Sequence, residues 1–507
     1  MAADAGTGST TRRPVDDPTL GIEVDVAREG SPHNRLVSIG DSLTHGFQSG
    51  AVFNTDLSYS AIVAHELGWP QLRYPVYAGP GGLPLNIELL LRELADRFGG
   101  DLDWWEVPPA LFAARQFADR VEDYWERGPG AAVPVVAAAR HVLAVYGWDL
   151  RDALQRNAAR AMSEVETPSD EVLDQLVSDH AARAALRVLP NATTADRERT
   201  VFDAAARLGE QGGIETLVVW LGANNALGTV TRLRVAWSGP GYDDLERNGA
   251  FTIWRPEHFA AELDLVAAEV EQIRARHVIW CTVPHVTIAP LAHGVGVKPR
   301  GSRYFPHYTR PWIAEGDFEP RRDPHITAAQ ARSVDSAIDR YNEAIERVVA
   351  GARRRGRDWY LCDIAGVVDR LATRRYLEDP SARPDWWTPY PLPPELAALH
   401  PVPDTRFLTT VDGRRAGGGL FSLDGVHPTT VGYGILAQEL IAVMERAGVA
   451  FNLPDGTRRP SPVRVDFDRL IRRDTLLTRP PANLTSGLGV LSWADEALDL
   501  LGLSLPF

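Results

Sequence analysis

Short runs of apolar residues alternate with amphipathic stretches along this chain. Five apolar runs predict buried strands, beginning near residues 36, 141, 216, 277 and 359. The stretches between them carry apolar residues at helical spacing, most clearly over 256–276 and 327–354. Strands that alternate with helices favour a parallel sheet with helices on both faces. We therefore expect an α/β protein with a three-layer, doubly wound core of five parallel strands.

The wide spacing of these strands also predicts insertions. We expect one domain over residues 32–450 and a C-terminal extension over 451–507 packed on it, with insertions at about 72–130, 160–212, 290–325 and 372–419. Leu72–Tyr77 is a candidate for a further strand. The first and third insertions are rich in aromatic residues, among them Trp104, Trp125, Tyr304 and Trp312. We expect these aromatic segments to form a packed insertion or a lid over the functional site.

Charge and terminal composition narrow the classes of partner. Residues 1–31 contain no apolar core of the kind found in signal peptides, and no run reaches the ~18 apolar residues of a membrane span. We expect a disordered leader on a soluble cytoplasmic protein with no integral membrane segment. The net charge of −14 argues against nucleic acid as a partner. Cys281 and Cys362 lie in predicted strands, so we expect buried free thiols.

Two short segments carry candidate catalytic chemistry. Gly40-Asp41-Ser42 turns the chain out of the first strand, which would place the serine hydroxyl at the carboxyl edge of the sheet. Near the other end of the chain, Asp424 and His427 are three residues apart on one turn, so the carboxylate could orient the imidazole. Each segment alone is ordinary turn composition. Together they supply the nucleophile, base and orienting group that an acyl hydrolase needs.

Three blocks of this sequence resemble the GDSL, or SGNH, family of esterases and lipases. They are Gly-Asp-Ser-Leu-Thr-His-Gly at 40–46, Gly-Ala-Asn-Asn at 222–225 and Asp-Gly-Val-His-Pro at 424–428. The resemblance implies a flavodoxin-like sheet and a catalytic triad of Ser42, Asp424 and His427. It also implies an oxyanion hole formed by the backbone N–H of Ser42, a glycine N–H and the side chain of Asn224. The sequence has Asn225 where the family usually has aspartate.

The glycine of the oxyanion hole has two candidate positions. Gly79, Gly81 and Gly82 come first along the chain, but the prolines among them remove backbone donors. Gly147 instead lies between a buried strand and a helical run, which is the pattern that aims an N–H at the edge of a sheet. We therefore place the donor at Gly147.

The remaining polar residues near these blocks are weaker candidates. Asp41, Asn225 and His285 are predicted to contact the substrate, although His285 could equally be a structural loop histidine. His45 is at most a pocket residue. The sequence contains neither a zinc-binding HExxH motif nor a G-x-S-x-G elbow.

The function expected from this set is hydrolysis of a carboxylic ester through an acyl-serine intermediate, without metal or cofactor. The aromatic insertions favour an apolar acyl or aryl ester as the small-molecule substrate. Two alternatives remain open: deacetylation of polar acetyl esters such as acetylated sugars, and a non-catalytic binding protein on the same scaffold.

Overall fold

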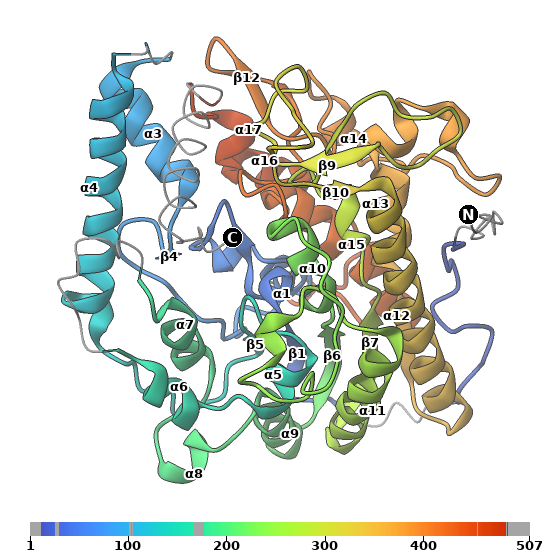
Figure 1. The fold of residues 1–507 in the computed structure, drawn as a ribbon. Helices are drawn as coiled ribbons and strands as arrows, with labels where there is room; N and C mark the ends of the chain where they lie inside the picture. Colours follow the sequence, from blue (N-terminus) through green and yellow to red (C-terminus); the bar gives the residue numbers. More distant parts are fainter. Residues whose placement is uncertain are drawn as a thin grey trace.

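The computed structural model describes residues 12–25, 30–100, 103, 105–166, 177–453, 455–482 and 484. Its centre is a five-stranded parallel sheet with the order β11-β7-β6-β1-β5 (Figure 1). The strands are β1 (Asn34–Gly40), β5 (Val142–Ala144), β6 (Ile214–Trp220), β7 (Ala275–Cys281) and β11 (Trp359–Cys362). Numbered along the chain, this order is 2-1-3-4-5, as in flavodoxin-like sheets. The prediction of a parallel five-stranded α/β core is confirmed.

Alternate residues of β1, β6, β7 and β11 enter two separate cores, one on each face of the sheet. Val37, Leu217 and Val278 pack on one side, while their neighbours Leu36, Val218 and Ile279 pack on the other. The first core is completed by α9 (Val201–Glu210), α11 (Pro256–Gln272) and α12 (Ala328–Arg354). The second is completed by α2 (Tyr59–Glu66), α13 (Ile364–Leu371) and α15 (Thr430–Arg446). Each fully buried aliphatic side chain stabilises this three-layer arrangement by about 1.5–3 kcal/mol.

Three small antiparallel sheets in the described part of the chain lie around the core. They consist of β2 (Phe47–Gln48), β3 (Ala51–Val52) and β4 (Leu83–Pro84); of β8 (His293–Val295), β9 (His307–Thr309) and β10 (Ile326–Thr327); and of β12 (Thr409–Val411) and β13 (Arg414–Gly417). The second of these sheets lies within and just after the predicted insertion at 290–325. It gives that long loop regular, hydrogen-bonded structure.

The remaining described α-helices have between 4 and 12 residues, apart from one of 20 residues in the first insertion. They are α1 (Ser42–His45), α3 (Ile87–Phe98), α4 (Val107–Glu126), α5 (Leu150–Gln155), α6 (Ala158–Glu164), α7 (His180–Val188), α8 (Thr194–Arg197), α10 (Asn224–Thr231), α14 (Pro394–Ala397), α16 (Phe467–Arg473) and α17 (Thr475–Thr478). Within the described ranges, each helix is too short or too polar to span a bilayer.

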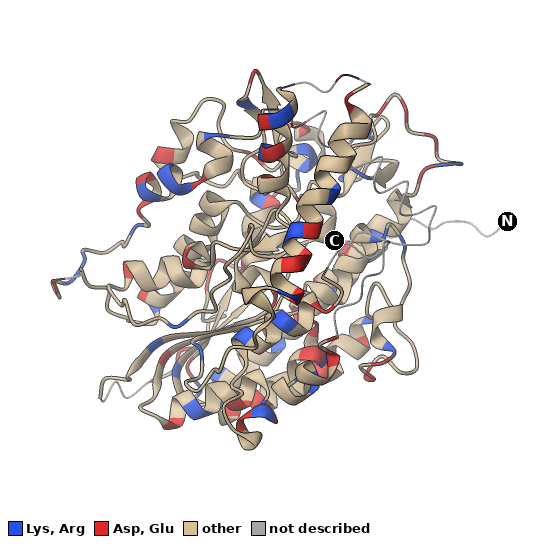
Figure 2. Cartoon of the chain, turned by 90° about the vertical axis from the view of Figure 1, so that its left-hand side faces the viewer, with Lys and Arg blue, Asp and Glu red and all other residues tan. Residues whose placement is uncertain are grey.

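Helices α3 and α4 form a flank of the molecule beside the sheet domain (Figure 1). Glu93 of α3 pairs with Arg97 on its own helix and with Arg120 on α4. Figure 2 views the molecule from this flank and shows acidic and basic residues interspersed along the helices. Surface pairs of this kind contribute about 0–1 kcal/mol each, so the buried side chains of α4 hold it more firmly than its charges do.

Leu72–Tyr77 does not form the strand considered for it. The segment runs beside the edge strand β5, where the carbonyl oxygen of Arg73 accepts hydrogen bonds from His141 N (2.7 Å) and Val142 N (3.3 Å). Pro75 has no N–H to donate, so the pairing cannot continue as a ladder. The predicted strand was wrong for this local reason.

Both terminal segments contact the domain where they are described. Within the expected leader, Val15 N donates to Asp363 Oδ2 (2.7 Å), and Pro18 O accepts from Leu361 N of β11 (2.9 Å). In the extension, α16 packs on α15, with Leu470 buried in the second core. Residues 1–11, 26–29 and 485–507 of the two terminal segments, and 167–176 of the second insertion, lie outside the described part of the chain.

Candidate active site

The path of the chain at the end of β1 places Ser42 at the carboxyl edge of the sheet. Gly40 is the last residue of β1, and a Cβ there would lie 2.0 Å from Thr44 Oγ1, so only glycine permits this tight turn. The Asp41 carboxylate then caps α1 by accepting a hydrogen bond from Leu43 N (3.1 Å). Ser42 is therefore the first residue of a short helix and lines a cavity at this edge.

Ser42, His427 and Asp424 form a continuous hydrogen-bonded chain. Ser42 Oγ lies 2.8 Å from His427 Nε2, and His427 Nδ1 lies 3.0 Å from Asp424 Oδ2. The carboxylate fixes the imidazole proton on Nδ1 and leaves Nε2 to accept the serine proton. All three residues are at least nine-tenths buried. This arrangement matches a nucleophile, a general base and a group that orients the base.

The Asp424 carboxylate is held by more than the histidine. Its Oδ1 accepts from Val426 N (2.9 Å) and His427 N (2.8 Å), and its Oδ2 also accepts from Gly50 N (3.0 Å). Burial alone would raise the pKa of Asp424, but the His427 side chain and the N–H groups of His427 and Val426 lower it below its usual value. The charged form is therefore favoured, and it can stabilise an imidazolium formed during a reaction.

Three hydrogen-bond donors line one cavity: the backbone N–H groups of Ser42 and Gly147, and the side-chain amide of Asn224. Gly147 follows β5 with φ +79°, and Asn224 is the first residue of α10 after β6. Within the described chain, no acceptor pairs with the backbone N–H of Ser42 or that of Gly147. The Asn224 amide donates one hydrogen bond to Trp148 O (2.8 Å), which fixes its orientation and leaves its second N–H free to donate. Such donors suit an oxyanion.

The competing glycines lie elsewhere. Gly81 N donates to Gly79 O (2.8 Å), and Gly82 O accepts from Trp125 Nε1 (2.8 Å) on α4. None of the three glycines at 79–82 lines either cavity beside Ser42. Gly147 therefore occupies the position beside Ser42.

A buried histidine that sequence reasoning set aside holds the Gly147 loop. His45 of α1 accepts a hydrogen bond at Nδ1 from Tyr146 N (3.2 Å), and its Nε2 lies 2.7 Å from the Tyr77 hydroxyl oxygen. Burial lowers the pKa of His45 to about 3, which keeps the ring neutral and able to accept at Nδ1. It thus joins the nucleophile helix to the residue before Gly147. Nothing in the spacing of residues 45 and 146 could have indicated this contact.

Of the three predicted substrate contacts, the structure places only His285 in the wall of a cavity at Ser42. Asp41 and Asn225 are fully buried and line neither adjacent cavity. Asp41 serves as a helix cap, and burial raises its pKa to about 7. His285 borders one cavity, but its ring nitrogens are held by Asp339 Oδ1 (2.9 Å) and Arg375 Nη1 (3.0 Å). These neighbours make it a structural histidine.

Two cavities meet at Ser42 and His427. One, of about 290 Å³, includes Asp149, Asp152 and Asn248 in its wall together with the three donors. The other, of about 90 Å³, is lined mainly by apolar side chains: Leu43, Trp220, Leu227, Val286, Ile364, Val368, Phe421 and Leu436. Neither has a lining residue from α4 or from residues 304–312. The described residues of the aromatic insertions therefore do not roof this site, because α4 packs on the flank and residues 304–312 line a separate cavity. Trp104, which was expected to take part, lies outside the described residues.

In the described residues, no group of three or more His, Cys, Asp or Glu side chains is placed to hold a metal ion.

The comparisons with known proteins add no assignment. No family model matches the chain, and no significant match is found among curated proteins.

Proposed function

We propose that this protein is a serine hydrolase of the SGNH type that cleaves a carboxylic ester through an acyl-Ser42 intermediate. The observation that carries the proposal is the hydrogen-bonded chain from Ser42 Oγ through His427 to Asp424, at the carboxyl edge of a parallel sheet. The unpaired N–H groups of Ser42 and Gly147 beside it, within the described chain, add the second requirement, donors for a developing oxyanion.

In the proposed reaction, His427 Nε2 removes the Ser42 proton as Oγ attacks the ester carbonyl carbon. The carbonyl oxygen becomes an oxyanion near the N–H groups of Ser42, Gly147 and Asn224. The imidazolium, stabilised by Asp424, then donates its proton to the departing alcohol as the ester C–O bond breaks. Water deprotonated by the same histidine hydrolyses the acyl-serine, releasing a carboxylic acid and restoring Ser42.

The size of the apolar cavity favours a short acyl chain. At about 90 Å³ it is smaller than the roughly 150 Å³ apolar cavity known to accept benzene. We therefore propose an acyl group of a few carbons rather than a long lipid chain. Because the larger cavity carries Asp149, Asp152 and Asn248, a polar alcohol is favoured on that side. An acetyl ester of a polar alcohol is accordingly the second candidate substrate.

Labelling with a fluorophosphonate, followed by peptide mass analysis, tests the proposal directly. We expect covalent modification at Ser42, together with hydrolysis of p-nitrophenyl acetate or butyrate. Ser42→Ala should abolish labelling and reduce kcat by ~10³-fold or more. Ser163→Ala, at an exposed serine on α6, is the matched control and should behave as wild type.

Two outcomes would contradict the proposal. Ester hydrolysis that persists in Ser42→Ala would exclude Ser42 as the nucleophile. A folded wild-type protein that neither reacts with the fluorophosphonate nor cleaves any ester of a chain-length series would favour a non-catalytic binding protein.

A further inference from the structure

Another cavity of the described structure is larger than either cavity at Ser42. It has a volume of about 480 Å³ and lies on the other side of the turn Val286–Ile288 from the apolar cavity. Its wall is built from four main parts of the chain: residues 287–294, 303–314, 372–375 and 405–409. It shares no lining residue with either cavity at Ser42, so it is a separate space.

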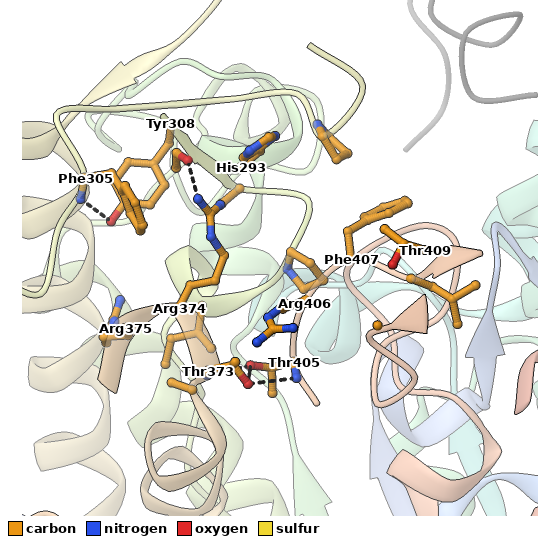
Figure 3. A pocket seen from close by; sticks show the side chains of 18 of the residues that line it. His293, Phe305, Tyr308, Thr373, Arg374, Arg375, Thr405, Arg406, Phe407 and Thr409 are labelled. Atoms are coloured by element: carbon orange, nitrogen blue, oxygen red, sulfur yellow. Dashed lines mark hydrogen bonds between the residues drawn. The ribbon is translucent and has the colours of Figure 1, made fainter. Parts of the chain in front are cut away.

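Aromatic side chains form much of this wall. Phe305, Tyr308 and Trp312 come from the third insertion, and Phe407 comes from the segment before β12. Figure 3 shows Phe305 and Tyr308 on one side of the space and Phe407 on the other. Aromatic rings placed in this way can enclose a planar apolar group. The aromatic residues of the third insertion, which do not line the cavities at Ser42, thus line this separate cavity.

Arg374 brings a positive charge to the same cavity, and the carboxylates of Glu378 and Glu315 act on it only beyond ion-pair distance. Its Nη2 donates to Gly294 O (2.8 Å), and its guanidinium lies 4.4 Å from the centre of the Phe305 ring. Among the described residues, no carboxylate forms an ion pair with it. Burial lowers the pKa of Arg374, which shows that its charge is held in a poorly solvated position.

The neighbouring arginines differ from Arg374 because each of them forms an ion pair with a carboxylate. Arg375 is paired with Asp335 (2.8 Å), and Arg406 is paired with Glu378 (2.7 Å). Figure 3 shows Arg374 and Arg406 extending into the space between His293 and Thr405. A partly buried guanidinium with spare N–H donors is an effective partner for a carboxylate or a phosphate.

We propose that this cavity is a binding site for a small organic anion, whose carboxylate or phosphate group pairs with Arg374 while its apolar body packs between the aromatic side chains. The negative charge of the ligand would give Arg374 the ion-pair partner that it lacks among the described residues. The aromatic side chains would contact the apolar body of the ligand. This site is independent of the function proposed for Ser42, because the two share no lining residue.

Calorimetric titration of the full chain with benzoate, phenyl phosphate and the uncharged benzamide tests the proposal. The two anions are expected to bind and benzamide to bind at least tenfold more weakly. Arg374→Met keeps the aliphatic stem and removes the charge, so it should weaken anion binding at least tenfold. Arg120→Met, on the surface of α4, is the matched control and should leave binding unchanged.

A second set of titrations distinguishes this cavity from the site at Ser42. Protein whose Ser42 has been blocked by fluorophosphonate should bind the anions as well as untreated protein does; loss of binding would place the anions at Ser42 and overturn the proposal.

If Arg374→Met does not fold, Phe305→Leu should weaken benzoate binding more than acetate binding. The relative affinities of benzoate and phenyl phosphate identify the preferred anionic group. Equal binding of benzamide and the anions, or no binding at all, would also overturn it.

Discussion

Ser42 and His427 are 385 residues apart in the chain, yet their side chains are joined by one hydrogen bond. Each owes its position to the local backbone: Asp41 caps the serine turn, and Asp424 accepts the N–H groups of Val426 and His427. Because Asp424 both shapes its turn and holds the imidazole, its structural role and its proposed catalytic role are coupled. Substitution of this residue would therefore disturb the turn as well as the proposed base.

Asn224 allows a cleaner test at the residue scale. In the proposed mechanism its free N–H donates more strongly to the oxyanion than to the substrate carbonyl, so Asn224→Ala should lower kcat by ~10²–10³-fold with little change in KM. Steady-state kinetics on a short-chain ester measures both constants. A rise in KM with unchanged kcat would make Asn224 a substrate-binding residue instead.

Gly147 tests the position of the backbone donor. An added Cβ would meet no atom within 4 Å, so Gly147→Ala extends a methyl group into open space, while φ +79° strains the alanine backbone and shifts the N–H. We expect turnover to fall at least tenfold. In Gly81→Ala the Cβ instead meets Asn86, away from Ser42, so this control should lose stability more than turnover. The reverse pattern would argue against Gly147 as the donor.

These residues also show how far sequence could predict the site. All five residues lie in short local patterns: Ser42, Gly147 and Asn224 follow strands, and Asp424 and His427 precede α15. The structure brings them to the wall of one cavity. His45 could not be recognised, because its role depends on a contact across 101 residues. Asp41 and Asn225 are next to site residues in the sequence but are buried and line neither cavity, because sequence position does not determine which way a side chain points.

At the scale of elements, the site is assembled where β1, β5 and β6 end side by side. In a 2-1-3-4-5 sheet the strand order reverses beside β1, and ligands of open α/β folds bind at such a point. The core strands were predictable because their apolar runs are continuous, as in sheets buried on both faces. Leu72–Tyr77 was not, because its pairing with β5 is interrupted by a single proline.

His45, which links α1 to the end of β5, should make the fold acid-sensitive. Its folded pKa of about 3 lies below the usual 6.5, so the unfolded state takes up the proton first as the pH falls. The stabilisation is complete above about pH 6.5 and is lost towards pH 3, at up to about 1.4 kcal/mol per pH unit. Between pH 7 and pH 4, the free energy of unfolding measured with urea should therefore fall by about 3 kcal/mol less in His45→Gln than in wild type.

The exposed His400 provides the control for this comparison. His400→Gln should retain the wild-type difference in unfolding free energy between the two pH values. If His45→Gln also retains it, the buried ring of His45 is not the source of the acid sensitivity.

Helix α13 tests the proposed acyl cavity through two adjacent valines. Val368 lines that cavity, whereas Val367 lines a different groove near residues 14–18. Val368→Ala should lengthen the space and raise the ratio of kcat/KM for octanoate over butyrate about tenfold, since one or two methylene groups are worth ~1–3 kcal/mol in such a pocket. Val367→Ala should leave the ratio unchanged. Equal ratios in the two variants would remove the acyl chain from this cavity.

At the scale of the whole molecule, three regions are separated: the sheet domain with the candidate active site, the aromatic cavity behind Val286–Ile288, and the flank formed by α3 and α4. Aromatic density in the sequence could not distinguish the last two. Trp125 is buried in the flank, whereas Trp312 lines the cavity. A tryptophan in an insertion predicts packing, but its partner is fixed only by the three-dimensional course of the chain.

The flank should accordingly contribute to stability and not to substrate selection. Trp125 is 1% exposed, its Nε1 donates to Gly82 O (2.8 Å), and the Arg187 guanidinium lies 4.5 Å from the centre of its ring. Trp125→Ala should lower the free energy of unfolding by about 3–5 kcal/mol because it leaves a large cavity. In the fraction that remains folded, counted by fluorophosphonate titration, the ratio of kcat/KM for octanoate over butyrate should equal that of wild type. A changed ratio would show that α4 influences the acyl cavity across the sheet domain, in which case the flank acts as part of the substrate site after all.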